Sequence, residues 1–274
     1  MNAQALPYTL LMLLAEFTVG GLWVLWLADL RGRSAASFLR FGAGLVSISA
    51  ALTLWTAAAI SVTDDVDGYP LDVSYVDSTR AALAVLFALS LLYAVLLLAG
   101  RRPLALAAGA AAAAAGLAAV AFLAQVVALP TWGYPATLLS LAVGALVVGA
   151  VSMGMILGHW YLVTPRLPEQ PLREMTAFLL AVMALDALLI ALALALPRDA
   201  IANAADTPIL QNPFFWLRIS GGLAFPMLLA YMAYDSSRLR AMQSATGLLY
   251  IAMALVLAGE VLGKGLLFVS AVPS

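Results

Sequence analysis

The sequence contains no cysteine and only one histidine, so several kinds of redox and metal site have no ligands in it. Without cysteine, the chain forms no disulfide and holds no iron–sulfur cluster of its own. With His159 as its single imidazole, it cannot supply both axial ligands of a bis-histidine haem. We therefore expect neither a haem nor an iron–sulfur cluster in this chain.

Charged residues are also scarce. They make up 10% of the 274 residues, whereas hydrophobic residues make up 65%, and the mean hydropathy is +1.04. A soluble domain is about one quarter charged, so this chain has too little polar surface to cover a water-soluble globule. The composition predicts an all-α polytopic membrane protein, with residues 1–274 in one integral membrane domain. Its surroundings would be membrane lipid, and we expect no nucleic acid partner.

Apolar runs of about 20 residues are long enough to cross a bilayer as helices. The first run lacks a basic leader and a small-residue cleavage pattern, so we interpret it as a true span and not as a signal peptide. Proline, glycine and charged residues separate the runs from one another. The sequence predicts eight spans, at about 7–29, 38–62, 81–100, 104–129, 135–163, 175–196, 214–234 and 243–271.

Basic residues sort to alternate loops. The first, third, fifth and seventh loops hold nine arginines: Arg31, Arg33, Arg40, Arg101, Arg102, Arg166, Arg173, Arg238 and Arg240. The opposite side holds Arg80 and Arg198, together with Asp64, Asp65, Asp67, Asp72, Asp77, Asp199 and Asp206. Under the positive-inside rule, the arginine-rich loops face the cytoplasm. Both termini would then lie outside, in the periplasm, which places the chain in a bacterial inner membrane as a multi-pass protein.

Six ionisable residues fall inside the predicted spans, where such groups are costly and are candidates for function. They are Glu16, His159, Asp186, Arg218, Glu260 and Lys264. At 1.5 Å per residue, four of them should lie at similar depth in the outer half of the membrane: Glu16, Arg218, Glu260 and Lys264. Glu260 and Lys264 are four residues apart, in "LAGEVLGKG", and therefore share a helix face.

Two interpretations of these charges stay open. In the first, they are buried ion pairs that fix helix packing, with Lys264 snorkelling outward. In the second, they line a polar pocket that opens to the outer leaflet and binds a lipid-soluble ligand coupled to protons. A quinone suits such a pocket, since its carbonyls need a cationic or hydroxyl donor and quinol oxidation needs a carboxylate as proton acceptor.

Asp186 and His159 are harder to place. Asp186 stands alone at mid-depth in "AVMALDALLIAL", where it is either protonated and hydrogen-bonded or part of a proton relay. His159 shares a helix face with Met155 and is a weak candidate for a metal ligand. An interfacial belt of His159, Trp160 and Tyr161 is the favoured interpretation, and we expect no metal.

Two stretches resemble a known family. The segment "LLYIAMALVLAGEVLGKGLLF" (248–268) resembles the last span of the membrane anchor subunit of dimethyl-sulfoxide reductase. The segment "LAEFTVGGLWVLWLADLRG" (14–32) resembles the first span of that family, which is similar in turn to the membrane subunits of polysulfide and nitrite reductases. The likeness covers about 40 residues at the two ends of the chain.

The resemblance implies a quinone-interacting anchor subunit of a respiratory oxidoreductase. Such subunits bind menaquinol or ubiquinol near the outer face and exchange electrons with an iron–sulfur subunit, itself joined to a molybdopterin-type catalytic subunit. Glu16, Glu260 and Lys264 would carry over by position, with Glu16 or Glu260 exchanging the proton. Lys264 or Arg218 would polarise the quinone oxygen. The family's glutamate at the start of span three is absent here, where Asp77, Ser78 and Thr79 occupy the region.

An anchor subunit would be at most a quinol-oxidising part of a larger enzyme. Two other functions remain as alternatives to it. A proton- or cation-coupled transporter would use Asp186 or Glu260 as a relay, and discontinuous helices at mid-membrane would favour it. Pro226 in span seven is the one mid-span proline break. A non-catalytic scaffold or assembly subunit would use the charges only to lock helices together.

A parallel four-plus-four duplication of the spans is conceivable, because an offset of four spans preserves orientation.

Overall fold

The chain folds into a helical bundle with one small β-hairpin. The computed structural model describes residues 5–66, 68–128, 133–164, 167–195 and 209–270. Eight helical segments in these ranges are long and apolar enough to cross a membrane, which confirms the predicted multi-pass, all-α architecture. Seven of the long elements are α1 (Leu6–Arg31), α2 (Ala36–Ala59), α3 (Val76–Leu98), α4 (Arg102–Val126), α5 (Gly133–Val163), α6 (Gln170–Ala195) and α9 (Met242–Ser270).

The remaining span is built from three consecutive elements. They are α7 (Pro213–Leu217), the π-helix η3 (Arg218–Ala224) and α8 (Phe225–Arg238). The shorter elements are β1 (Asp65–Val66), β2 (Tyr69–Pro70) and the 3-10 helices η1 (Val73–Tyr75) and η2 (Ile209–Gln211). β1 and β2 pair antiparallel, with Val66 opposite Tyr69.

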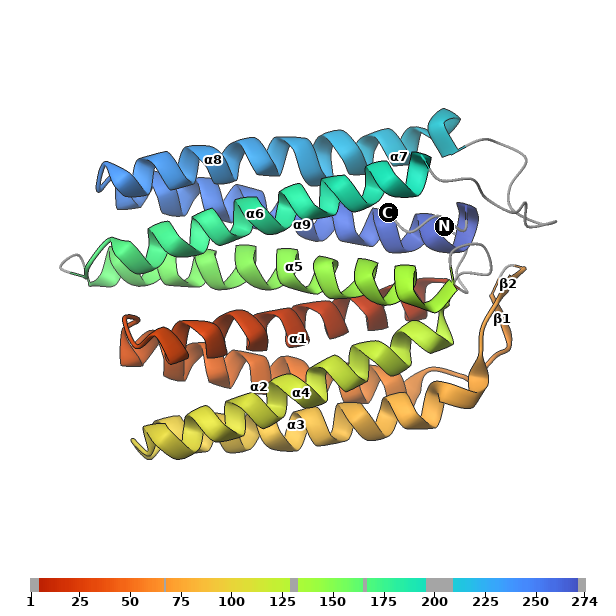
Figure 1. Cartoon of the computed structure of the whole chain (residues 1–274), viewed down its shortest axis with the longest axis horizontal. Helices are drawn as coiled ribbons and strands as arrows, with labels where there is room; N and C mark the ends of the chain where they lie inside the picture. The colour runs from red at the N-terminus through yellow and green to blue at the C-terminus, as the bar shows by residue number, and fades with distance from the viewer. Residues whose placement is uncertain (1–4, 67, 129–132, 165–166, 196–208, 271–274) are drawn as a thin grey trace.

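The two ends of the bundle differ in charge. Helix α1 begins and α9 ends at the same end, which we call the terminal end (Figure 1). The opposite end holds Arg31, Arg33, Arg40, Arg101, Arg102, Arg173, Arg238 and Arg240, and we call it the arginine end. Arg80 lies at the terminal end, as the predicted alternation of loops requires. Asp67, Arg166, Arg198, Asp199 and Asp206 lie outside the described residues.

The bundle consists of two four-helix halves with the same pattern of neighbours. In the first half, α1 and α3 each pack against α2 and α4. In the second half, α5 and α8 each pack against α6 and α9. Helices α1 and α5 pack against each other between the halves, as Figure 1 shows. This arrangement has the topology that a parallel four-plus-four duplication would give.

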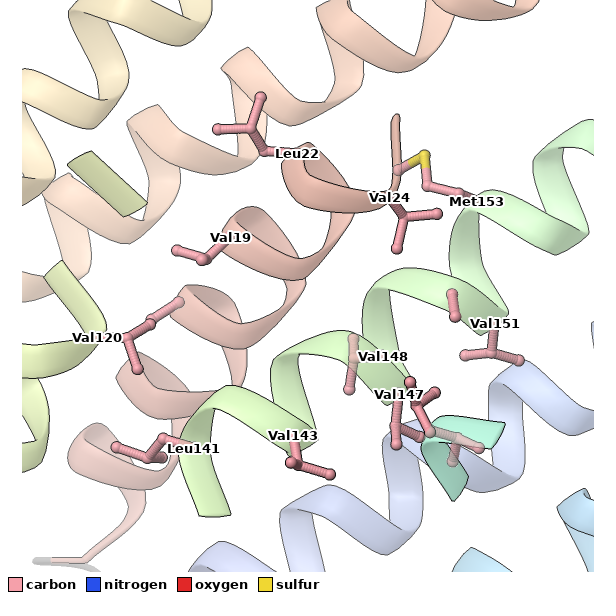
Figure 2. Close-up of a cluster of buried hydrophobic side chains, with 14 of the residues drawn as sticks. Val19, Leu22, Val24, Val120, Leu141, Val143, Val147, Val148, Val151 and Met153 are labelled. Carbon is pink, nitrogen blue, oxygen red and sulfur yellow. The ribbon is translucent and has the colours of Figure 1, made fainter. Parts of the chain in front are cut away.

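Glycines set the distance between the two halves. A Cβ atom added to Gly20 of α1 would lie 1.6 Å from the carbonyl oxygen of Ala145 on α5. A Cβ atom on Gly149 would lie 2.1 Å from the carbonyl carbon of Gly20. The backbones therefore touch where both helices lack side chains, as small residues allow in membranes. Around this contact, valines and leucines of α1, α4 and α5 fill the interior (Figure 2).

The alanine-rich helix α4 packs closely against α1. Its low side-chain bulk lets two indoles of α1 reach the α4 backbone: Trp23 Nε1 donates to Ala113 O and Trp26 Nε1 donates to Leu106 O, each at 3.0 Å. Gly109 lies under the second indole, since a Cβ atom there would lie 2.5 Å from Trp26 Cδ1. The small residues of this run serve close packing between helices.

Helix α3 begins earlier than predicted, at Val76, because its first turn extends beyond the apolar run. Arg80, expected in the loop, lies on this turn and donates from Nε to Ala57 O at 2.9 Å and from Nη2 to Ile60 O at 3.2 Å. These carbonyls belong to the end of α2 and have no partners within that helix. The arginine therefore caps a neighbouring span.

The β-hairpin lies over the terminal end of the bundle, and Tyr69 anchors it there. The Tyr69 side chain is buried, at 3% exposed. Its hydroxyl donates to Val127 O at 2.9 Å, and its ring meets the edge of Phe268, with centroids 5.4 Å apart. Burial raises the pKa of the Tyr69 phenol above its ordinary value. Phe214 and Trp216, in contrast, are exposed.

Candidate functional site

Five ionisable side chains meet in the interior of the bundle and form what we call the charge network. It consists of Glu16, Asp186, Arg218, Glu260 and Lys264. These residues come from α1, α6, η3 and α9, so helices of both halves contribute. All of them lie in the half of the bundle nearer the terminal end, because α1, η3 and α9 reach that end within a few turns of them. The predicted similarity in depth is therefore found.

The contacts run in a line of alternating sign. Lys264 Nζ lies 2.7 Å from Glu16 Oε1 and 3.2 Å from Glu260 Oε2. Arg218 Nη2 donates to Glu260 Oε1 at 2.8 Å and to Asp186 Oδ2 at 3.0 Å. Glu260 is therefore the central acid, held between the two cations, while Glu16 and Asp186 are the two outer acids.

The network is enclosed by protein. Each of its five residues is at most 5% exposed, and Asp186 is the most exposed of them. Lys264 is 2% exposed and points at two carboxylates, so the expectation that it snorkels outward is wrong. The expected pocket open to the outer leaflet is also not what surrounds these charges, since they lie in a packed interior.

Asp186 is not the isolated acid that its sequence context suggests. It pairs with Arg218, thirty-two residues later in the chain. The apolar residues on either side of Asp186 in the sequence gave no sign of this partner, because the pairing joins α6 to a different helix. Arg218 thereby links two acids that are distant in sequence.

A π-helix positions Arg218. Pro226 has no N–H group and so leaves the carbonyl of Gly222, four residues earlier, without its usual helical donor. Arg218 Nη1 donates to this carbonyl at 3.3 Å. Gly222, within the π-helix, lies against Gly259 of α9, since a Cβ atom added to Gly222 would lie 2.5 Å from the Gly259 Cα atom. π-Helical turns occur frequently at functional sites.

Gly144 of α5 leaves space beside the network. A Cβ atom at this position would lie 2.5 Å from Glu16 Oε1 and 3.4 Å from Glu260 Oε2. The missing side chain therefore lets two carboxylates approach the same ammonium group of Lys264. The sequence does not distinguish Gly144 from the other glycines of its span, because Gly144 becomes distinctive only through the two acids opposite it.

The charges of the network do not balance. Three carboxyl groups face two cations, so the fully ionised network would carry one excess negative charge. Burying an uncompensated charge in an apolar medium is very costly, and an acid in that position takes up a proton instead. The arrangement is therefore suited to binding and releasing a proton within the membrane.

A groove lies between the beginning of α1 and the end of α2, at the terminal end. Its volume is about 640 Å³, and mainly apolar side chains of α1 and α2 line it, including Leu6, Leu10 and Trp55. Tyr8 also lines it and donates its hydroxyl to Ser61 O at 3.3 Å. None of the five network residues lines this groove. Leu6, Leu10 and Trp55 are strongly exposed, so the groove opens sideways toward the surroundings of the bundle.

His159 lies at the arginine end, away from the network. Its Nδ1 atom is 3.2 Å from the Tyr250 hydroxyl, and the next residue, Trp160, donates from Nε1 to Ser37 Oγ at 2.7 Å. These contacts fit the interfacial belt. Among the described residues, no three His, Cys, Asp or Glu side chains come together as a metal site.

A fourth buried acid, outside the charge network, escaped the sequence analysis. Asp29, at the end of α1, is fully buried and accepts hydrogen bonds from Tyr93 Oη and Arg102 Nε, both at 3.1 Å. One acid and one cation balance here, and Arg102 is half exposed at the arginine end. Asp29 therefore fastens α1 to α3 and α4, with no excess charge.

Comparisons of the chain with protein-family models, with curated proteins and with solved structures found no match.

Proposed function

We propose that this protein is the quinone-interacting membrane subunit of a multi-subunit respiratory oxidoreductase, and that the charge network exchanges the proton that accompanies quinone chemistry. The observation that carries the proposal is the excess acid among five buried charges. Apolar residues of similar volume are often at least as stabilising as a buried ion pair, so a network of this size suggests a role beyond packing. Ionisable groups within membrane spans typically mark proton relays and substrate pathways.

The groove beside α1 supports the quinone part of the proposal. Its volume of about 640 Å³ lies within the usual range for small-molecule sites. It offers the exposed Trp55 ring for stacking, and its lateral opening suits an isoprenoid tail. To donate to a quinone oxygen, the Tyr8 hydroxyl would have to turn away from Ser61 O. Tyr8 and Glu16 lie on the same helix, about 12 Å apart along its axis at 1.5 Å per residue.

The electrons need a partner protein. Oxidation of one quinol yields a quinone, two electrons and two protons. The electrons would pass to an iron–sulfur cluster of a partner subunit, because this chain has no cysteine to hold one. That subunit would deliver them to a molybdopterin-type catalytic subunit. One proton would enter the charge network, and the other would go to water.

The distribution of arginine suggests how the protein sits in a bacterial inner membrane. The arginine end carries most of the described basic residues, and the terminal end carries Asp64, Asp65, Asp72 and Asp77. We place the arginine end in the cytoplasm and the terminal end in the periplasm by the positive-inside rule. The groove and the network would then lie in the periplasmic half of the membrane, where the partner subunits would dock.

Purification with intact partners tests the proposal. The protein should copurify with quinone and with a subunit that contains iron and acid-labile sulfur. Glu260→Gln should abolish quinol-dependent reduction of that partner while the protein still inserts into the membrane. The matched variant Glu174→Gln, the same change at the arginine end, should retain activity. A single polypeptide without quinone, or full activity in Glu260→Gln, would reject the proposal.

A proton-coupled transporter is the second candidate, and the π-helix favours it. Helices that are interrupted at mid-membrane commonly form the substrate sites of secondary transporters, and η3 interrupts span seven beside Arg218. Reconstituted vesicles separate the two functions. A transporter would move a solute in response to a pH gradient without any partner protein, whereas a quinone-linked subunit would not.

A further inference from the structure

We infer that Glu16, Lys264 and Glu260 form a unit that exchanges a single proton, with Gly144 providing its space and with Arg218 and Asp186 as a fixed pair that positions it. This inference deepens the proposed proton exchange and rests on it. It also assigns a resting place to the proton, which is the carboxyl group of Glu16.

The number of cationic neighbours, together with the hydrogen bonds that each carboxyl group accepts, distinguishes the three acids. Glu260 lies between Arg218 and Lys264 and has contacts of 2.8 and 3.2 Å with them, so its negative charge is the best compensated. Asp186 has one cation, Arg218, which it shares with Glu260, and it accepts a hydrogen bond of 3.0 Å from Arg218 Nη2. Glu16 also has one cation, Lys264, which it shares with Glu260, but neither of its carboxyl oxygens accepts a hydrogen bond from a described residue. The excess proton is therefore best placed on Glu16.

The two cations, Arg218 and Lys264, differ in whether they can transfer a proton. A guanidinium does not lose its proton in proteins, so Arg218 cannot relay a proton between Asp186 and Glu260. An ammonium group can lose one when it is buried, and Lys264 lies between Glu16 and Glu260. The mobile proton is thus confined to one side of Arg218. Arg218 and Asp186 form a neutral pair that holds Glu260 in place.

Gly144 leaves the space that lets Glu16 and Glu260 share Lys264. The space where its side chain would lie borders Glu16 Oε1 at 2.5 Å and Glu260 Oε2 at 3.4 Å. Both carboxylates can therefore turn toward Lys264 from the same side. A methyl group at this position would displace Glu16, since a Cβ atom essentially never lies 2.5 Å from a non-bonded heavy atom of another residue. We accordingly treat Gly144 as a positioning residue of the unit.

Infrared spectroscopy of the purified full-length protein tests the inference without quinone or partner subunits. Protonated carboxylic acids give a C=O band that shifts in heavy water. The wild-type protein should show one such buried acid. Glu16→Gln should lose that band, and Glu16→Asp should keep a band at a changed frequency. Asp186→Glu and the control Glu174→Gln should leave the band where it is.

Gly144→Ala supplies an independent readout. It should shift or broaden the band of Glu16 while every acid remains present, and Gly44→Ala, at a position with open space, should not. A wild-type protein without the band, a band that persists in Glu16→Gln, or a band that moves in Asp186→Glu would overturn the inference. If the band behaves as expected and quinol activity is absent, the proton unit stands and the proposed oxidoreductase function fails.

Discussion

The two halves of the molecule share a pattern of helix packing and differ in the chemistry of their interiors. The first half buries hydroxyl groups between α1 and α2: Thr18 Oγ1 lies 2.6 Å from Ser49 Oγ and 2.9 Å from Thr53 Oγ1. The second half buries charges between α6, η3 and α9. Neutral hydroxyls satisfy one another as they stand, whereas buried charges are stable only in the right number and sign.

Glu16 connects the first half of the molecule to the charge network. It lies on α1 of the first half, only two residues before Thr18, yet its carboxyl group pairs with Lys264 of the second half. The hydroxyl cluster, in contrast, stays within its own half. The comparison predicts that removing a cation from the charge network will have a larger effect than removing a hydroxyl, and that the effect of removing an acid will depend on the total charge.

Removal of Arg218 should have the largest effect. Arg218→Met leaves three buried acids with one cation, and breaking a buried ion pair by removing one partner typically costs about 3–5 kcal/mol. Thermal unfolding in detergent, followed by circular dichroism, measures the loss. The double variant with Asp186→Asn should regain much of it. Arg101→Met, at an exposed position, should leave the transition unchanged, and equal stability of Arg218→Met and wild type would contradict the prediction.

The glycine contact between the halves should come next. Gly149→Ala places a methyl group where the Gly20 backbone lies and should cost about 1–3 kcal/mol or more through overpacking. The same measurement on Gly44→Ala gives the matched control, because no atom lies within 4 Å of a Cβ atom there. If both variants unfold at the same temperature, the two halves are not in the close contact described.

A hydroxyl of the first half should matter less than any cation of the second. Thr53→Val removes a buried hydrogen-bonding group without changing the charge and should cost about 1 kcal/mol. Thr56→Val is the control, since its hydroxyl is exposed and bonds only to Leu52 O of its own helix. A loss in Thr53→Val as large as that in Arg218→Met would remove the distinction between the two interiors.

The docked hairpin should show the smallest effect, and one that depends on pH. Below pH 10 the Tyr69 phenol is protonated whether or not the hairpin is docked. Above that pH the undocked phenol ionises first, because burial raises the pKa of the docked one. Docking should therefore weaken as the pH rises further, and proteolysis between residues 63 and 70 should accelerate. Tyr69→Phe should remove this dependence on pH, and an unchanged dependence would reject the role of Tyr69.

The sequence was sufficient to predict the spans and most of the network. Apolar runs determine where helices cross, and depth along each run placed Glu16, Arg218, Glu260 and Lys264 together. The sequence was not sufficient to pair Asp186 with Arg218, because that contact depends on which helices become neighbours. It also gave no reason to single out Gly144, whose role depends on two side chains from other helices.

The helix boundaries and the loops could likewise be predicted only in part from the sequence. Arg80 was assigned to a loop because it interrupts an apolar run, whereas the helix continues through it and uses it to cap α2. The burial of Tyr69 does not follow from the sequence, because it depends on how the hairpin folds back over the bundle. Asp29 was overlooked because it lies at the edge of its span. In each case a tertiary contact decided the outcome, and a single sequence carries little information about such contacts.

A double-mutant cycle between Glu16 and Asp186 tests most directly whether the five charges act as one network. These acids lie at its opposite ends, and each single change to the amide leaves two acids facing two cations. We expect each single variant to keep its stability within about 1 kcal/mol, because every remaining charge has a partner. The double variant leaves one acid between two cations and should lose far more than the sum of the singles, which is the signature of coupling. Additive losses would contradict a shared network and would leave two independent ion pairs.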